Sequence, residues 1–291
     1  MKLHFTAVGA QSPVIKHSVS PFEQIVSLFS GSMSEPTLYG WFHFLCLIIV
    51  LILCMLAVSN RQKVTEKSLR LTLGVTSAIM LAFEIYKQIV FAYTPETDVW
   101  EYNWSAFPFQ FCSTPMYVML LAALVKDGKF RDGLLAFLAT YSLVAGGGVM
   151  LYPVTVFTET IGINIQTMLH HGAMVVIAVY LLSSGLVKFE FNTILKGAFP
   201  VFITLVGMAI TMNFLFDKFG DGSDFNMFYI APGKDFLLPI LEKIFSGLPH
   251  FVYLFSYVSF FSLAAYLVLR LARFSQHAYH TAQEKIYDKK L

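Results

Sequence analysis

The chain has 291 residues, of which 56% are hydrophobic and only 13% carry a charged side chain. A soluble domain carries roughly a quarter charged residues, so this composition excludes an ordinary soluble protein. The mean hydropathy is +0.65, and the net charge of +2 comes from scattered basic residues that form no nucleic-acid-binding patch.

Seven apolar stretches follow one another along the chain. A helix needs about 20 apolar residues to cross about 30 Å of hydrocarbon. The sequence therefore predicts an all-α fold, a polytopic membrane helical bundle with seven transmembrane helices. These helices are expected at residues 38–58, 71–93, 107–125, 133–152, 167–187, 197–216 and 248–270.

Lysine and arginine are divided unequally between the two sets of connections. One set carries Arg61, Lys63, Lys67, Arg70, Lys126, Lys129, Arg131, Lys188, Lys196, Arg270, Arg273, Lys285, Lys289 and Lys290, whereas the other carries Lys2, Lys16, Lys218, Lys234 and Lys243. Cytoplasmic connections are the ones enriched in these residues. We therefore expect a multi-pass protein of the cell membrane with its N-terminus outside and its C-terminus in the cytoplasm.

This topology divides the chain into three parts. Residues 1–37 are expected to form an extracytoplasmic N-terminal segment, residues 38–270 the seven-helix membrane domain, and residues 271–291 a cytoplasmic basic tail. The N-terminal segment has no continuous apolar stretch, so it does not resemble a cleavable signal peptide.

Polar side chains of several predicted helices fall at one depth, near the outer membrane face, whereas the cytoplasmic halves are almost entirely apolar. Ionisable groups inside a span are costly and mark candidate functional sites. The polar set is Glu84, Lys87 and Gln88, then Gln110, Cys112 and Ser113, then His170 and His171, and finally Asn213, His250 and Tyr253. Their common depth predicts a polar pocket that opens to the outer leaflet or to the outside water.

Cys112 is the cysteine with the most reactive surroundings. It lies about one turn past Pro108, in the first turns of the helix expected from residue 107, and the dipole of a helix start favours a thiolate. Because Pro115 has no N–H group, the carbonyl of Phe111 is expected to be a free acceptor beside the cysteine. The alternative is a small core residue, which is the interpretation we give to Cys46 and Cys54.

His170 and His171 are neighbours on a helix, so their side chains point about 100° apart. Only one of them faces the pocket, and His171 shares a stripe with Asn164 and Thr167. A cysteine beside this histidine would form a nucleophile and its base. The alternative is a histidine that hydrogen-bonds a neighbouring helix. Adjacent histidines diverge and no spaced ligand motif occurs, so no metal and no cofactor are expected.

Glu84 and Lys87 lie three residues apart on one helix face. Their simplest interpretation is a neutralising ion pair, and the alternative is a catalytic carboxylate that orients His171. Residues 146–148 are three consecutive glycines. Close helix packing through small residues is the first interpretation of this run, and a broken transport helix is the second.

Several runs resemble a known family. The sequences FPFQFCSTPMYVMLLAAL, INIQTMLHHGAMVVIAVYLL and FNMFYIAP are similar to those of the YwaF-like integral membrane family, over nearly the whole chain. An animal branch of that family looks like a lipid acyltransferase that makes polyunsaturated ether phospholipids with a membrane cysteine and histidine. The matching positions are Cys112 and His171, and Asn226 matches a further polar position. Gln110 and Ser113 stand where bacterial and animal relatives, respectively, carry a histidine.

Three functions fit these residues. In the first, Cys112, activated by His171 and with Glu84 orienting the imidazole, attacks a lipid acyl ester in the manner of an acyltransferase or acyl hydrolase. Gln110, Ser113 or Asn226 donates to the oxyanion. The second is a transporter or a lipid- or small-molecule-binding protein without catalysis, and the third is a scaffold in a membrane complex. The partners expected are membrane lipids, with an acyl-chain ligand that contacts Gln110, Ser113, Lys87, Gln88, His170, Asn213, Asn226, His250 and Tyr253.

Overall fold

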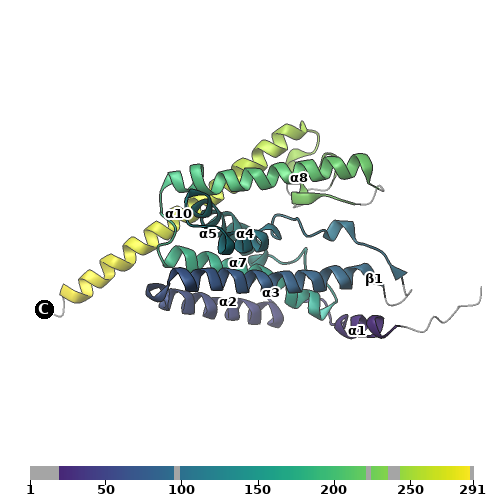
Figure 1. Cartoon of the computed structure of the whole chain (residues 1–291), viewed down its shortest axis with the longest axis horizontal. Helices are drawn as coiled ribbons and strands as arrows, with labels where there is room; N and C mark the ends of the chain where they lie inside the picture. The colour runs from purple at the N-terminus through teal and green to yellow at the C-terminus, as the bar shows by residue number, and fades with distance from the viewer. Residues whose placement is uncertain (1–19, 95–98, 221–223, 235–242, 289–291) are drawn as a thin grey trace, which may run out of the picture.

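The computed structural model describes residues 20–94, 99–220, 224–234 and 243–288. It is a helical bundle whose long helices lie side by side (Figure 1). In chain order the main helices are α1 (Pro21–Phe29), α2 (Trp41–Ser59), α3 (Glu66–Ala92), α4 (Thr114–Leu124), α5 (Lys129–Ala139), α6 (Tyr141–Leu151), α7 (Ile161–Ser183), α8 (Phe199–Phe219) and α10 (His250–Asp288).

Six helices of the described residues are long and apolar enough to cross a membrane. They are residues 41–59, 66–92, 129–151, 161–183, 193–219 and 250–279. The protein is therefore a multi-pass membrane protein. Six of the seven expected stretches correspond to these helices. The remaining one, the third in chain order at 107–125, does not form a helix of that length.

The stretch 107–125 is helical only over α4, which has 11 residues. At 1.5 Å per residue this helix is about 17 Å long, too short to cross the hydrocarbon alone. The residues before it, 107–113, follow a short 3₁₀ turn at Trp104–Ala106 and take an irregular path. Pro115, at the start of α4, sits where a missing N–H is tolerated.

Two of the long helices are interrupted. α5 and α6 together make one apolar segment, but Thr140 between them leaves helical geometry, and its hydroxyl donates to the Ala136 carbonyl at 2.6 Å. A back-bonded threonine of this kind bends a helix. The π-helical turn Thr193–Ala198, η3, leads directly into α8.

Helix α7 lies at the centre of the bundle and packs on α2, α3, α5 and α6. Gly146 of α6 allows one of these contacts, because a Cβ atom there would lie 2.7 Å from the Met174 Cβ and 2.9 Å from the His171 carbonyl oxygen. Gly147 and Gly148 have open space around them. Small-residue packing is therefore the role of Gly146 alone.

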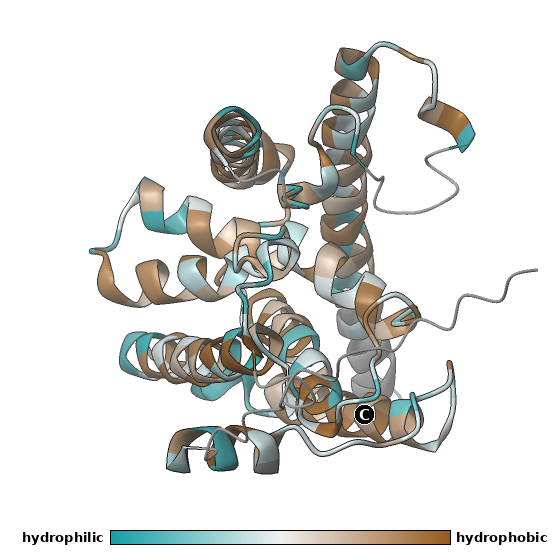
Figure 2. Ribbon diagram, turned by 90° about the vertical axis from the view of Figure 1, so that its right-hand side faces the viewer, coloured by the Kyte–Doolittle hydropathy of each residue, from teal (hydrophilic) through white to brown (hydrophobic). Residues whose placement is uncertain are grey.

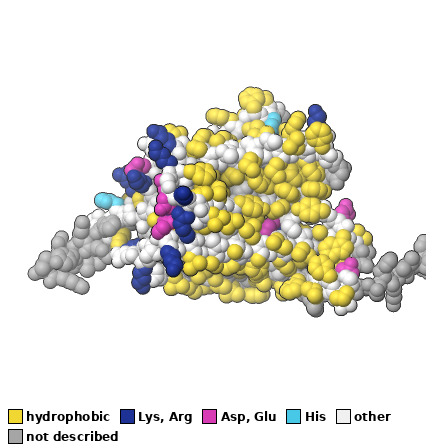
Figure 3. All heavy atoms as spheres, in the orientation of Figure 1, with side chains coloured by type: hydrophobic (Ala, Val, Ile, Leu, Met, Phe, Trp, Pro, Cys, Tyr) yellow, Lys and Arg dark blue, Asp and Glu magenta, His cyan; other side chains and the backbone are white. Residues whose placement is uncertain are grey.

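The outer surface is apolar. Helix α2 is the extreme case, since only 6% of its span is buried inside the protein. Hydrophobic residues make up much of every long helix (Figure 2), and hydrophobic atoms cover the middle of the visible face of the molecule (Figure 3). A surface of this kind requires lipid around it.

Charged side chains gather at the end of the bundle from which α10 extends, as dark blue and magenta atoms in Figure 3. Arg131 is buried there and donates to the Ala122 carbonyl at 2.8 Å. It also pairs with Glu66 at 2.9 Å and with Asp127, and Arg70 pairs with the same two carboxylates. We call Glu66, Arg70, Asp127 and Arg131 the arginine cluster.

The opposite end carries α1 and the two-residue strands β1 (Tyr93–Thr94) and β2 (Val99–Trp100), which pair antiparallel. Ser20 and Glu23 form a capping box that starts α1. The Tyr86 hydroxyl of α3 donates to the Phe29 carbonyl at 2.7 Å. Part of the expected N-terminal segment is thus a helix docked on α3, and its residues 1–19 lie outside the described residues.

Candidate functional site

Cys112 lies in the irregular segment that leads into α4, one residue before the N-cap Ser113. It is partly buried and unoxidised. Its carbonyl oxygen accepts a hydrogen bond of 3.0 Å from Nε2 of His170 on α7. The neighbouring Ser113 is buried. The histidine that contacts the Cys112 residue is thus His170.

His171 is held differently. Its Nδ1 donates to the carbonyl oxygen of Thr167, one turn earlier, at 2.7 Å. This bond places the proton on Nδ1 and leaves Nε2 as a neutral acceptor. The Nε2 atom is buried and has no hydrogen-bond partner among the described residues, and the same is true of Nδ1 of His170. The two rings are 5.6 Å apart between centroids.

Glu84 is 3% exposed and lies on α3. Its Oε1 atom pairs with the Lys87 ammonium at 2.8 Å and accepts from the Gln88 amide at 2.8 Å. The expected ion pair is therefore present. The second oxygen, Oε2, is buried and receives no hydrogen bond within the described part of the chain.

Gln88 extends this chain of contacts to the end of the bundle. Its amide also donates to the Ala106 carbonyl at 2.8 Å, and its oxygen accepts from the Tyr102 hydroxyl at 2.7 Å. Burial, assisted by the negative charge of Glu84, raises the pKa of Tyr102. The hydroxyl therefore stays protonated as a donor, and Gln88 links Glu84 to the connection before α4.

These groups form one electrostatic unit, which we call the histidine cluster: Glu84, Lys87, Cys112, His170 and His171. The charges of Glu84 and Lys87 act on both the Cys112 thiol and the His171 ring. Within the described residues, Glu84 Oε2 and His171 Nε2 both lack a hydrogen-bond partner and His171 Nδ1 is bonded to Thr167, so Glu84 does not orient His171 through a hydrogen bond. What the cluster has in common is three buried acceptor atoms without a donor: Glu84 Oε2, His170 Nδ1 and His171 Nε2.

Three amides expected in the pocket instead hold a loop. The Gln110 amide donates to the Asn226 carbonyl and its oxygen accepts from the Phe228 N–H, both at 2.9 Å. Asn213 binds both backbone groups of Met227, at 2.7 and 3.0 Å. The Asn226 oxygen accepts from the Ala231 N–H at 2.9 Å. These bonds place the connection after α8 against the Cys112 segment.

The loop is strained where these amides hold it. Phe228 and Tyr229 both have positive φ, of 60° and 56°, a conformation that bulky residues rarely adopt. The Tyr253 hydroxyl of α10 donates to the Tyr229 carbonyl at 2.9 Å, so this expected pocket residue also braces the loop. His250 lies at the start of α10, where it lines a pocket with Tyr253.

The expected free acceptor beside Cys112 is absent. The carbonyl oxygen of Phe111 accepts a hydrogen bond of 2.9 Å from the Thr114 hydroxyl, which replaces the N–H that Pro115 lacks.

The helix face shared by Asn164, Thr167 and His171 predicted the pocket residues only in part. Asn164 binds the backbone of Thr158 through its oxygen and its amide, at 2.9 and 2.7 Å, and thereby fixes the loop before α7.

Residues 29–269 match the sequence profile of the TMEM164 family. The chain belongs to the TMEM164 family. Neither a curated protein nor a solved structure matches it. Because the match runs from the end of α1 to the last turns of the α10 span, it includes every residue of the histidine cluster.

Two buried groups of this TMEM164-family chain were not singled out by sequence reasoning. His43 of α2 accepts from the Tyr39 N–H at 3.0 Å and its other nitrogen donates to the Met150 carbonyl at 2.8 Å, so it joins α2 to α6. Arg131 was counted only as a charge that sets orientation. A histidine early in an apolar helix was the available signal for His43.

Among the residues with described positions, no group of three or more histidine, cysteine, aspartate or glutamate side chains is arranged to hold a metal ion.

Proposed function

We propose that this TMEM164-family protein is a membrane enzyme that transfers or hydrolyses lipid acyl chains through a thioester on Cys112. One observation carries the proposal: three buried acceptors, two of them imidazole nitrogens, lack donors beside a partly buried cysteine. Leaving such a group unpaired costs about 1–3 kcal/mol, so a stable core avoids it. A reacting hydroxyl or thiol supplies the missing proton donor.

The thiol and the imidazole have matched roles in this reaction. His171 takes the Cys112 proton on Nε2, the nitrogen that its bond to Thr167 leaves free. The thiolate attacks the ester carbonyl carbon, the C–O bond breaks, and the departing lysolipid oxygen takes the proton from the imidazolium. A thioester remains on Cys112.

The second half-reaction reverses these transfers. An acceptor hydroxyl, or water, gives its proton to His171 and attacks the thioester carbonyl. The sulfur leaves as a thiolate and takes the proton back, which restores the enzyme. Lys87, whose charge acts on the Cys112 thiol, supplies positive charge for the oxyanion of both steps. It replaces Gln110 in that role, since the Gln110 amide is bonded to Asn226.

The remaining cluster members position these groups. His170 holds the Cys112 carbonyl, and Glu84 keeps Lys87 in place through its Oε1 atom. The resemblance of the Cys112 and His171 segments to the YwaF-like family, and to its animal ether-phospholipid acyltransferase branch, supports the same assignment.

The proposal includes the topology. Residues 107–124 make a seventh crossing, half irregular and half helix, because non-helical backbone is tolerated at membrane depth when protein surrounds it. Phe111 and Ser113 in the irregular half are buried. With seven crossings, the lysine and arginine bias supports an N-terminal segment outside and a tail from residue 271 in the cytoplasm. The membrane is then the cell membrane, with the histidine cluster in its outer half.

The test is acyl transfer in nanodiscs that contain the full-length protein. Phosphatidylcholine with an isotopically labelled acyl chain serves as donor and an ether lysophospholipid as acceptor, and mass spectrometry follows the label. Cys112→Ala should abolish transfer, and His171→Gln should slow it by about 10²–10⁴-fold, the usual contribution of a general base.

Two further measurements make the result specific. Cys46→Ala and Cys54→Ala remove the other two cysteines and should leave transfer unchanged. Intact-mass analysis of the unaltered protein should show an acyl adduct that hydroxylamine removes, as expected of a thioester. Equal transfer by Cys112→Ala and the unaltered protein would overturn the proposal.

A further inference from the structure

Two pockets adjoin each other between the end of α8 and the start of α10. The first, of about 360 Å³, has a polar lining that includes Lys234, Ser246 and His250. The second, of about 250 Å³, is mostly apolar and is lined by Ile210, Phe214 and Leu254, among others. Ala231, Lys234 and His250 belong to both linings. The Lys234 side chain thus lies at the boundary between the polar pocket and the apolar pocket.

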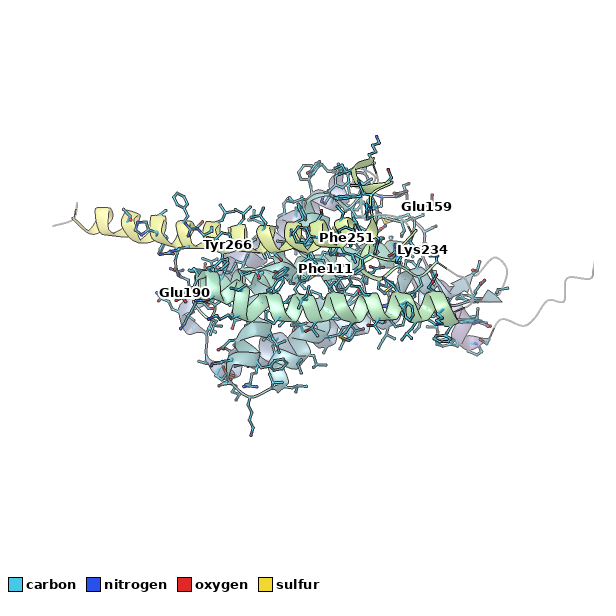
Figure 4. All side chains as sticks on the ribbon, turned by 90° about the horizontal axis from the view of Figure 1, so that it is seen from above. Phe111, Glu159, Glu190, Lys234, Phe251 and Tyr266 are labelled. Atoms are coloured by element: carbon cyan, nitrogen blue, oxygen red, sulfur yellow. The ribbon has the colours of Figure 1, made fainter. Side chains whose placement is uncertain are left out.

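The position of these pockets along the bundle is specific. The α8 span ends at Phe219 and the α10 span begins at His250, so both helices change from apolar to polar surroundings there. Figure 4 shows Lys234 at the end of the molecule opposite Glu190, near the start of α10. Lipid phosphates occupy the layer just outside the hydrocarbon. The polar pocket is therefore at the level of a lipid head group.

The charge of Lys234 is incompletely neutralised. Within the described residues its ion pair is with Asp224, at 3.9 Å, which is beyond hydrogen-bonding distance. Among the described residues, the Lys234 ammonium therefore has no hydrogen-bonded carboxylate. Asp217 lines the apolar pocket but not the polar one, so the polar side of Lys234 is the side where a bound anion meets less repulsion from that carboxylate.

We propose that these two pockets form a binding site for a phosphate-bearing lipid. Lys234 and the imidazole N–H of His250 hold the phosphate, and an acyl chain lies against Ile210, Phe214 and Leu254. Together the pockets fall in the size range of ordinary ligand sites, about 300–1,000 Å³. No bond is made or broken in this site, so it stands whether or not Cys112 reacts.

The site is connected to the histidine cluster by short contacts. Tyr229 lines the polar pocket and is one residue from Phe228, whose N–H is bonded to Gln110. Gln110 is two residues before Cys112 in the irregular segment. A lipid held by Lys234 therefore contacts the same strained loop that supports the Cys112 backbone.

The experiment uses full-length Cys112→Ala protein in dodecyl maltoside, so that binding is measured without turnover. Four probes are titrated by isothermal calorimetry: lysophosphatidic acid, lysophosphatidylcholine, monoolein and inorganic phosphate. The two phosphate-bearing lipids should bind at least tenfold more tightly than monoolein, which has a similar chain without phosphate, and than inorganic phosphate, which has no chain.

Variants separate the head-group contact from the chain contact. Lys234→Gln should reduce the affinity for both phosphate lipids to that for monoolein, whereas Lys243→Gln, an exposed lysine that lines neither pocket, should leave it unchanged. Leu254→Trp should weaken the binding of all three lipids, because the larger side chain fills the apolar pocket. Ile210→Trp serves the same purpose if Leu254→Trp does not fold.

Equal affinity of monoolein and lysophosphatidic acid would overturn the proposal, as would unchanged binding in Lys234→Gln. Inorganic phosphate that binds as tightly as the lipids would also overturn it, because the apolar pocket would then have no role. Failure of acyl transfer with intact lipid binding would reject the reaction at Cys112 and leave this site standing.

Discussion

The two ends of the bundle treat buried polar groups in opposite ways. In the arginine cluster each charge has an opposite partner, and Arg70 and Arg131 also donate to the last carbonyls around α4. In the histidine cluster three buried acceptors have no donor within the part of the chain that the structure describes. The first arrangement stabilises the fold. The second costs stability and is retained where a protein needs groups ready for another molecule.

The largest stability effect should come from the arginine end. Arg131→Met removes a buried guanidinium that holds Asp127, Glu66 and the Ala122 carbonyl. Breaking one partner of a buried ion pair costs about 3–5 kcal/mol, and the exposed carboxylates here favour the lower figure of about 3 kcal/mol. Thermal unfolding in detergent measures it.

Lys129→Met is the control, since Lys129 is exposed and close in sequence to Arg131. The midpoint of thermal unfolding of Lys129→Met should equal that of the unaltered protein. If Arg131→Met unfolds at the same temperature as this control, the arginine cluster contributes nothing to stability and the contrast between the two ends is wrong.

A smaller effect is expected at the packing contact behind His171. Gly146→Val places a Cβ atom 2.7 Å from the Met174 Cβ and 2.9 Å from the His171 carbonyl oxygen, so α6 and α7 must separate. Overpacking of this kind costs about 1–3 kcal/mol. Gly147→Val introduces the same side chain where no atom lies within 4 Å, and it should cost less. Denaturation of the two variants side by side gives the difference.

The smallest stability effect is predicted for a member of the histidine cluster. His171→Leu removes Nε2, which has no partner among the described residues, together with the hydrogen bond from Nδ1 to the Thr167 carbonyl. The two losses act in opposite directions, so the free energy of unfolding should change by less than about 1 kcal/mol. His43→Leu is the matched comparison, because both His43 nitrogens are bonded. That change leaves two backbone groups unpaired and should cost about 2 kcal/mol.

Opposite results would remove the basis for a functional cluster. If His171→Leu destabilises the protein more than His43→Leu, then His171 is a structural residue and its unpaired nitrogen has a partner in the membrane-embedded protein.

Much of the fold was predictable from hydropathy. Six of the spans were expected near their observed places, because a 20-residue apolar stretch has one stable form in lipid. The third, 107–125, was wrong as a continuous helix. Its average hydropathy is that of a span, but Thr114 and Gln110 provide side-chain partners for the irregular backbone, and such partners are not visible in a hydropathy pattern.

The candidate site was predicted in part. The three-residue spacing of Glu84 and Lys87 correctly predicted their ion pair. The depth of a residue in the membrane did not reveal which polar side chains already have hydrogen-bond partners within the protein. Gln110 and Asn213 lie at the expected end of the bundle, yet their amides are used by the loop 226–231. That loop is distant in sequence from Gln110, so only folding shows that the two meet.

The sequence by itself determined that this chain lives in a membrane and which residues are polar within it, because burying charge in hydrocarbon is costly wherever it occurs. The tertiary structure decided which of those polar groups are satisfied. His43 and His171 are both histidines of apolar helices, and no local pattern distinguishes them. Their difference depends on neighbouring helices: the Met150 carbonyl of α6 completes the bonding of His43, whereas nothing in the described protein reaches Nε2 of His171.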